Sequence, residues 1–141
     1  MEEVKYIPGD LVKFKDKVQA ITNIDRKTSY RIEISMENGI CVCKPEDIET
    51  HIRPVKLTPE IILKQNGWEQ WWKGKHFYRT HLGENADYLS YLYLWDIGHG
   101  GGFIVRVGED MYTYYKIGEI QYVHQLQHLL LVLGLDSNLK V

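Results

Sequence analysis

The stretch of sequence that decides the fold is YLSYLYLWDI at residues 88–97, followed at once by GHGGG at residues 98–102. Aromatic and leucine side chains alternate along it with the period of a β-strand, and both faces of that strand are apolar. This pattern predicts a strand that is covered on both sides. The glycines predict a turn that returns the next apolar run, residues 103–107, beside it as an antiparallel strand.

The sequence around this hairpin predicts further elements of the same unit. Residues 71–79 predict another hairpin, and residues 111–117 predict a last strand. Residues 121–133 have apolar side chains at helical spacing and end before Gly134, a good residue to follow a helix. We therefore expect residues 68–141 to form an antiparallel sheet packed on a C-terminal helix.

The first part of the chain alternates in shorter segments. Asn38-Gly39 is a strong signal for a tight hairpin turn, because these residue types adopt positive φ most easily. The strands predicted around it are residues 11–14, 18–24, 30–36 and 40–43. Several short strands within about 50 residues are typical of a small barrel, so we expect an SH3-like β-barrel at residues 1–55.

Residues 56–67 predict a linker helix. Thr58 is a good N-cap, Pro59 suits the first helical position, and Glu60 favours the positive end of the helix dipole. The whole chain is thus expected to belong to the α+β class.

Composition and charge restrict the class of partner. The 141 residues are 44% apolar and 26% charged, and 17 Lys and Arg against 19 Asp and Glu give a net charge of −2. Proteins that bind duplex DNA or anionic membranes depend on a basic surface, so both partners are disfavoured. No stretch has the roughly 18 apolar residues of a membrane helix, and the first residues lack an apolar signal segment. We expect a cytoplasmic protein.

The C-terminal helix carries no charged residue between Glu119 and Asp136. A surface helix usually has charges on its outer face, so this one is expected to be covered on more than one side. A homodimer formed through the C-terminal helix is the predicted assembly.

Two segments carry a resemblance to known proteins. They are PVKLTPEIIL at residues 54–63 and YVHQLQHLL at residues 122–130. Over nearly its whole length the chain resembles a group of small uncharacterised proteins from Bacteroidetes, their phages and their mobile elements. The resemblance implies a barrel-like part, a connector, a sheet and a closing helix in that order. It also implies a phage or mobile-element setting, but no activity.

His124 and His128 lie one helical turn apart, which is the spacing that zinc hydrolases use. Those enzymes place Glu beside the first His as a general base, but this chain has Gln125 there. Members of the resembled group often have Asn at the position of His128. Structural packing is therefore the favoured interpretation of the pair, and a metal-dependent hydrolase is kept as an alternative. No cofactor is predicted.

Two further segments suggest a site for an anion. One is the glycine-rich turn, whose bare amides could approach a ligand, although a flexible hairpin turn explains it more simply. The other is a pair of adjacent tryptophans, of which one is expected at the surface, with basic residues nearby; sheet packing explains aromatic residues equally well. The predicted ligand-binding residues are Trp71, Trp72, Lys75, Arg79, His99, Gly100 and Gly101.

These motifs do not assemble a nucleophile, a base and an oxyanion donor, so a binding protein is favoured over an enzyme. The expected ligand is small, anionic and of nucleotide type, and a phage protein would sequester it as an anti-defence sponge. The alternative from another class is an SH3-like adaptor that binds a host protein or a nucleic acid.

Overall fold

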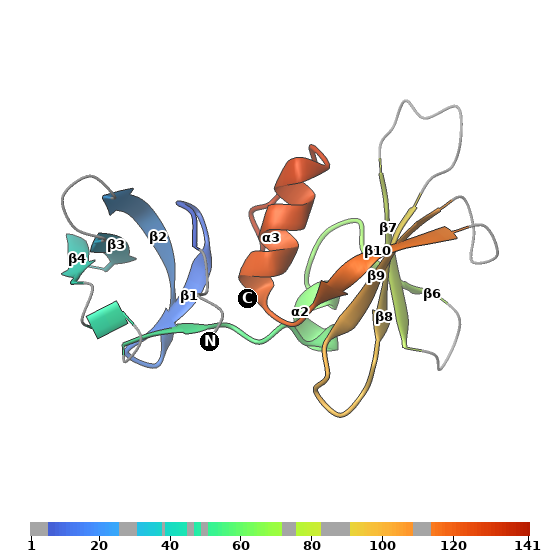
Figure 1. The fold of residues 1–141 in the computed structure, drawn as a ribbon, viewed down its shortest axis with the longest axis horizontal. Coiled ribbons are helices and arrows are strands. Elements are labelled where there is room, and N and C mark those ends of the chain that lie inside the picture. Colours follow the sequence, from blue (N-terminus) through green and yellow to red (C-terminus); the bar gives the residue numbers. More distant parts are fainter. Residues whose placement is uncertain are drawn as a thin grey trace. The chain divides into compact units, whose positions relative to one another are not determined.

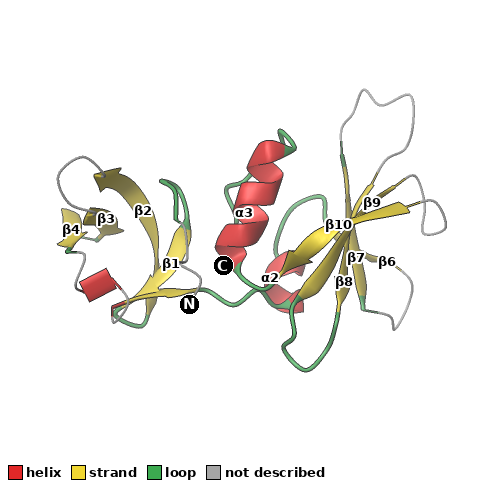
Figure 2. Cartoon of the chain, viewed as in Figure 1, coloured by secondary structure: helices red, strands yellow, loops and turns green. Residues whose placement is uncertain are grey.

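The computed structural model describes residues 6–25, 31–37, 39–44, 47–48, 51–71, 76–82, 91–108 and 114–141. The chain divides into two compact units, Met1–Val55 and Lys56–Val141. Each unit contains one five-stranded antiparallel sheet (Figure 1). The second unit also contains helices α2 and α3 (Figure 2). The α+β class expected from the sequence is confirmed.

The first sheet is a meander with one returning strand. Its strands are β1 Leu11–Phe14, β2 Lys17–Asp25, β3 Arg31–Met36, β4 Gly39–Cys43 and β5 Ile52–Pro54, in the spatial order β4-β3-β2-β1-β5. The returning strand pairs with β1, with Val12 opposite Pro54. The register between β2 and β3 shifts between Ile21 and Asn23, and such an irregularity bends a strand.

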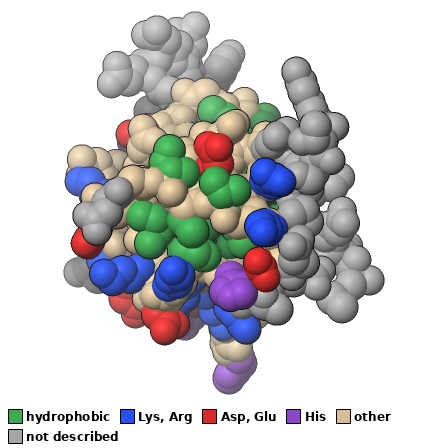
Figure 3. Space-filling view, turned by 90° about the vertical axis from the view of Figure 1, so that its left-hand side faces the viewer, with side chains coloured by type: hydrophobic (Ala, Val, Ile, Leu, Met, Phe, Trp, Pro, Cys, Tyr) green, Lys and Arg blue, Asp and Glu red, His purple; other side chains and the backbone are tan. Residues whose placement is uncertain are grey.

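Alternation decides which side of this sheet is buried. Ile32 and Ile34 are fully buried on β3, whereas Ile40 and Val42 on β4 are 61% and 50% exposed. Figure 3 faces this unit and shows hydrophobic side chains gathered at the centre of the surface, with charged side chains around them. The buried core consists of Tyr6, Val12, Phe14, Ile21, Ile32, Ile34, Cys43 and Ile52. No pairing joins β4 to β5 among the residues described, so the sheet is not closed into the expected barrel.

The second sheet is an antiparallel meander throughout. Its strands are β6 Glu69–Trp71, β7 Phe77–His81, β8 Tyr91–Asp96, β9 Phe103–Gly108 and β10 Tyr114–Ile120, in the order β10-β9-β8-β7-β6. The strand predicted at residues 88–97 is β8, and residues 88–90 lie outside the described part of the chain.

The last strand differs from its prediction. It continues to Ile120 instead of ending at Ile117, because Gly118, Glu119 and Ile120 still pair with β9. The register shifts between Lys116 and Gly118, so Ile117 forms a bulge in this edge strand.

Helix α2, Pro59–Leu63, is shorter than the predicted linker helix. Its predicted N-cap is confirmed, because the Thr58 Oγ1 accepts a hydrogen bond from the backbone N–H of Ile61 at 3.3 Å. A helix of five residues has little stability of its own. The fully buried Ile62 provides the packing that holds it.

Helix α3, Val123–Val132, begins two residues later than predicted. The Gln125 Oε1 accepts hydrogen bonds from the backbone N–H groups of Gln121 and Tyr122, at 2.7 and 3.0 Å, and so caps the first turn. The predicted inner stripe is buried at Val123, Leu126 and Leu130. Its fourth predicted member, Leu133, is only half-buried. Toward the end of the helix, Leu131 and Val132 are 56% and 84% exposed in the single chain.

Two buried glutamines hold the C-terminal tail against the second unit. The Gln65 Nε2 donates to the backbone carbonyls of Ile61 and Lys140, at 2.7 and 2.6 Å. The Gln65 Oε1 accepts from the backbone N–H of Lys140 at 2.9 Å. The Gln127 Nε2 donates to the carbonyl of Ser137 at 3.3 Å. We call the three hydrogen bonds of Gln65 the tail clasp.

Both helices of the second unit lie on the same side of its sheet (Figure 1). Leu92, Leu94 and Val105 are buried on that side, at most 2% exposed. Burial, followed by the negative charges of Asp96 and Glu60, raises the pKa of Tyr78 on this side of the sheet. Within the part of the chain that the structure describes, no helix is long and apolar enough to cross a membrane.

Candidate ligand-binding face

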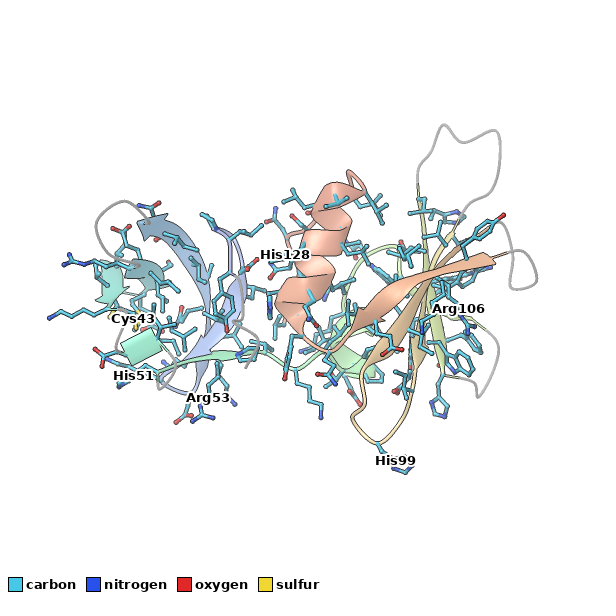
Figure 4. The ribbon with its side chains drawn as sticks, in the orientation of Figure 1. Cys43, His51, Arg53, His99, Arg106 and His128 are labelled. Carbon is cyan, nitrogen blue, oxygen red and sulfur yellow. The ribbon has the colours of Figure 1, made fainter. Side chains whose placement is uncertain are left out.

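The side of the second sheet opposite the helices carries aromatic and arginine side chains. Phe77, Trp95 and Ile104 are register partners across β7, β8 and β9. In the next row Arg79 and Arg106 lie on either side of Tyr93. Figure 4 shows Arg106 on the side of the sheet that faces away from α3. We call this surface the open face.

Trp95 is the centre of the first row. Its indole stacks on the Phe77 ring, with centroids 5.1 Å apart and planes 16° from parallel. The Arg106 Cζ lies 4.5 Å from the centroid of the Trp95 ring, which is cation–π distance. The indole therefore contacts an aromatic ring from one neighbouring strand and a guanidinium from the other.

Tyr91 is the centre of a second group on the same face. The Arg79 Cζ lies 4.2 Å from its ring centroid, and the His81 ring lies 4.4 Å away. The Arg79 Nε also pairs with the Glu69 Oε1 at 2.6 Å. Because two partners fix the guanidinium of Arg79, its position over Tyr91 is well defined.

β8 was expected to be covered on both sides, and the middle of the strand is buried on both. Leu92 and Leu94 are fully buried on the side of the helices, and Tyr93, in the middle of the other side, is only 3% exposed. On that other side the described side chains of neighbouring strands stack on one another, so lateral stacking accounts for part of the aromatic content.

The predicted ligand-binding residues are only partly described. Trp72 and Lys75 lie outside the described residues, and of Trp71 only the backbone is described, opposite Phe77 at the end of β6. Arg79 lies on the open face. The register places the ends of β6 and β8, and hence the glycine-rich turn, at the same end of the sheet.

The glycine-rich turn closes the β8–β9 hairpin. The Ile97 N–H donates to the Gly102 carbonyl at 3.0 Å, and the Gly101 N–H donates to the Gly98 carbonyl at 2.9 Å. His99 stands at its tip and points away from the sheet (Figure 4), with a φ of 52° that is uncommon outside glycine. His99, Gly100 and Gly101 are all exposed.

Sequence reasoning missed Lys56, which reaches this turn from a distant part of the chain. A Cβ on Gly100 would collide with the Lys56 Nζ and would lie 3.3 Å from its Cε. The backbone of Lys56 pairs with Tyr122 in an isolated antiparallel bridge just after the end of β10. No local pattern marks this lysine, because its place beside Gly100 depends on tertiary pairing.

His124 and His128 contact each other edge to face, with ring centroids 5.6 Å apart. The Tyr122 ring also stacks on the His124 ring, with ring centroids 5.9 Å apart. Burial and then the charge of His128 lower the pKa of His124 to about 4, so its imidazole is neutral at pH 7. Among the described residues, no group of three or more His, Cys, Asp or Glu side chains is placed to hold a metal ion.

Comparisons with protein-family models, with curated proteins and with solved structures find no match to this chain.

Proposed function

We propose that this chain is a non-enzymatic binding protein that takes up a small anionic ligand of nucleotide type on the open face of its second sheet. The observation that carries the proposal is the position of Trp95 between Phe77 and Arg106. Aromatic rings stack on planar bases, and an arginine guanidinium adds cation–π attraction to such a stack.

The charge of the open face suits a single small anion better than a long polyanion. Arg79 is paired with Glu69, and Lys116 is paired with Glu119 at 3.0 Å, so two of the cations are partly neutralised. Arg106 lies over the Trp95 ring as well. Stacking on an aromatic side chain is worth about 1 to 3 kcal/mol per base, and a hydrogen bond to a charged group adds about 1.5 to 3 kcal/mol.

The biological role that we propose is sequestration. It rests on the resemblance to phage and mobile-element proteins, in which a protein that binds a nucleotide signal without turning it over would act as an anti-defence sponge. The fold and the open face support the binding step of this role.

Thermal shift with a panel of linear and cyclic nucleotides tests the proposal, because a ligand that binds only the native state raises Tm. Arg106→Lys keeps the charge but removes the planar guanidinium, and it should reduce the shift. Arg53→Lys, an exposed arginine on β5, is the matched control and should leave the shift unchanged. No shift with any nucleotide would refute this function.

A second function is favoured by one observation in the first unit. The meander β1–β4 and the return of β5 to β1 support an SH3-like unit, and the edge strand β4 exposes Ile40 and Val42. An adaptor that binds a host protein would use this surface. If this second function is correct, a host protein should co-purify with the full-length wild type but not with full-length Ile40→Asp. Nucleotides should then leave the Tm of the wild type unchanged.

A further inference from the structure

The glycine-rich turn and Lys56 form a cluster at the end of the second sheet where β8 ends. The Lys56 ammonium occupies the space that a side chain at Gly100 would fill. Its backbone is fixed nearby, because Lys56 pairs with Tyr122 and the Leu57 N–H donates to the Gln121 carbonyl at 2.9 Å. Lys56 is exposed, and the three ion pairs formed by described residues do not include it.

The base of the turn has no room for a side chain at Gly102. A Cβ on Gly102 would lie 2.5 Å from the carbonyl oxygen of Ile120 and 2.7 Å from the Gln121 Cγ. The side chain of Gln121 also reaches the Gly101 carbonyl at 3.5 Å. The close approach at Gly102 anchors the base of the turn, and Gly100 leaves room at its tip for the ammonium of Lys56.

From this arrangement we infer that the turn binds the phosphate of the ligand. The Lys56 Nζ would meet the phosphate oxygens, and the exposed backbone N–H groups of His99 and Gly100 would donate to them. The inference rests on the proposed function, because the base would lie on the Phe77 and Trp95 row.

One group in the turn opposes an anion. The Asp96 Oδ1 accepts from the Gly98 N–H at 2.8 Å, so a carboxylate lies at the base of the turn. Its repulsion makes the net attraction depend on Lys56. Asp96→Asn keeps an oxygen acceptor for Gly98 and removes the charge, and it should raise the affinity for the phosphate.

The test compares a nucleoside with its 5′-monophosphate in calorimetric titrations of the full-length protein. The wild type should bind the monophosphate about tenfold more tightly or better, since a hydrogen bond to a charged group contributes on this scale. Lys56→Gln should remove this preference and leave the nucleoside affinity unchanged. Lys64→Gln, an exposed lysine just after α2, is the matched control and should retain the preference.

The outcomes separate this inference from the proposed function. If Lys56→Gln binds both ligands like the wild type, the phosphate site is refuted while nucleotide binding stands. If neither ligand binds, the proposed function fails, and titration of the wild type with pyrophosphate then decides the fate of the site. Binding of pyrophosphate that Lys56→Gln abolishes would support the site, and absence of such binding would overturn it. Gly100→Ala, whose Cβ displaces the ammonium, should weaken phosphate binding in the same way.

Discussion

Replacing Gln65 tests whether the tail clasp stabilises the second unit. Gln65 is 8% exposed, and its side chain makes three hydrogen bonds, two of them to Lys140. Gln65→Ala removes all three. Water can reach the exposed Lys140, so part of the loss is recovered there, whereas the carbonyl of Ile61 is half-buried.

The expected size of the effect follows from the number of bonds. One intramolecular hydrogen bond contributes about 1 kcal/mol net. Three bonds, less what water recovers, give a loss of about 2 kcal/mol in the free energy of unfolding. For a unit of this size about 4 °C of Tm correspond to 1 kcal/mol, so Tm should fall by about 8 °C.

Chemical denaturation followed by tryptophan fluorescence measures this change, and hydrogen exchange localises it. The Lys140 N–H should lose its protection in Gln65→Ala, because its acceptor is gone. Gln65→Glu should be at least as damaging at pH 7, since a carboxylate oxygen then faces the carbonyls of Ile61 and Lys140. Asn138→Ala, an exposed residue of the same tail, is the control. A change below about 0.5 kcal/mol with unaltered exchange at Lys140 would show that the clasp is not stabilising.

Three further predictions concern the second unit. The pKa of His124 is about 4 in the folded protein and about 6.5 in the unfolded chain, so the stabilisation by neutral His124 is complete above pH 6.5 and declines as the pH falls toward 4. Between pH 7 and pH 5 the free energy of unfolding should fall by about 1 to 2 kcal/mol. In urea titrations His124→Gln should show a smaller fall, and an equal fall in the variant would exclude this origin. Gly102→Ala should destabilise by at least about 2 kcal/mol, because its Cβ meets the Ile120 carbonyl at a φ of 95°; a melting curve that matches the wild type would contradict this. If α3 forms a homodimer, Val132→Glu should convert a dimer to a monomer in light scattering, and a wild type that is already monomeric would refute the dimer.

The elements that the sequence predicted well depend on local patterns. The alternation around Ile32 and Ile34 predicted β3, and the Thr58 cap predicted the start of α2, because both signals lie within a few residues. The predicted end of β10 was wrong, because the strand continues past Ile117 after a bulge. The alternation of apolar and polar residues does not reveal a bulge.

The candidate site was predicted only where it is continuous in sequence. Gly100 was proposed from the composition of its turn, but Lys56 was not, because the pairing of Lys56 with Tyr122 brings it there. The strand that holds Trp95 was predicted from its alternation. The stacking of Trp95 between Phe77 and Arg106 was not predicted, because it depends on which strands lie beside β8.

The bulge in β10 has a consequence for the behaviour of the protein in concentrated solution. β10 is an edge strand, and its backbone could template a neighbouring chain, all the more because Tyr115 and Ile117 are exposed. The register shift at Ile117 twists this edge, and the ion pair of Lys116 with Glu119 places charges along it. An incoming strand would have to fit the irregular spacing and desolvate both charges, so this edge resists intermolecular sheet growth and aggregation. The first sheet has no such protection on β4, whose five residues, GICVC, carry no charge.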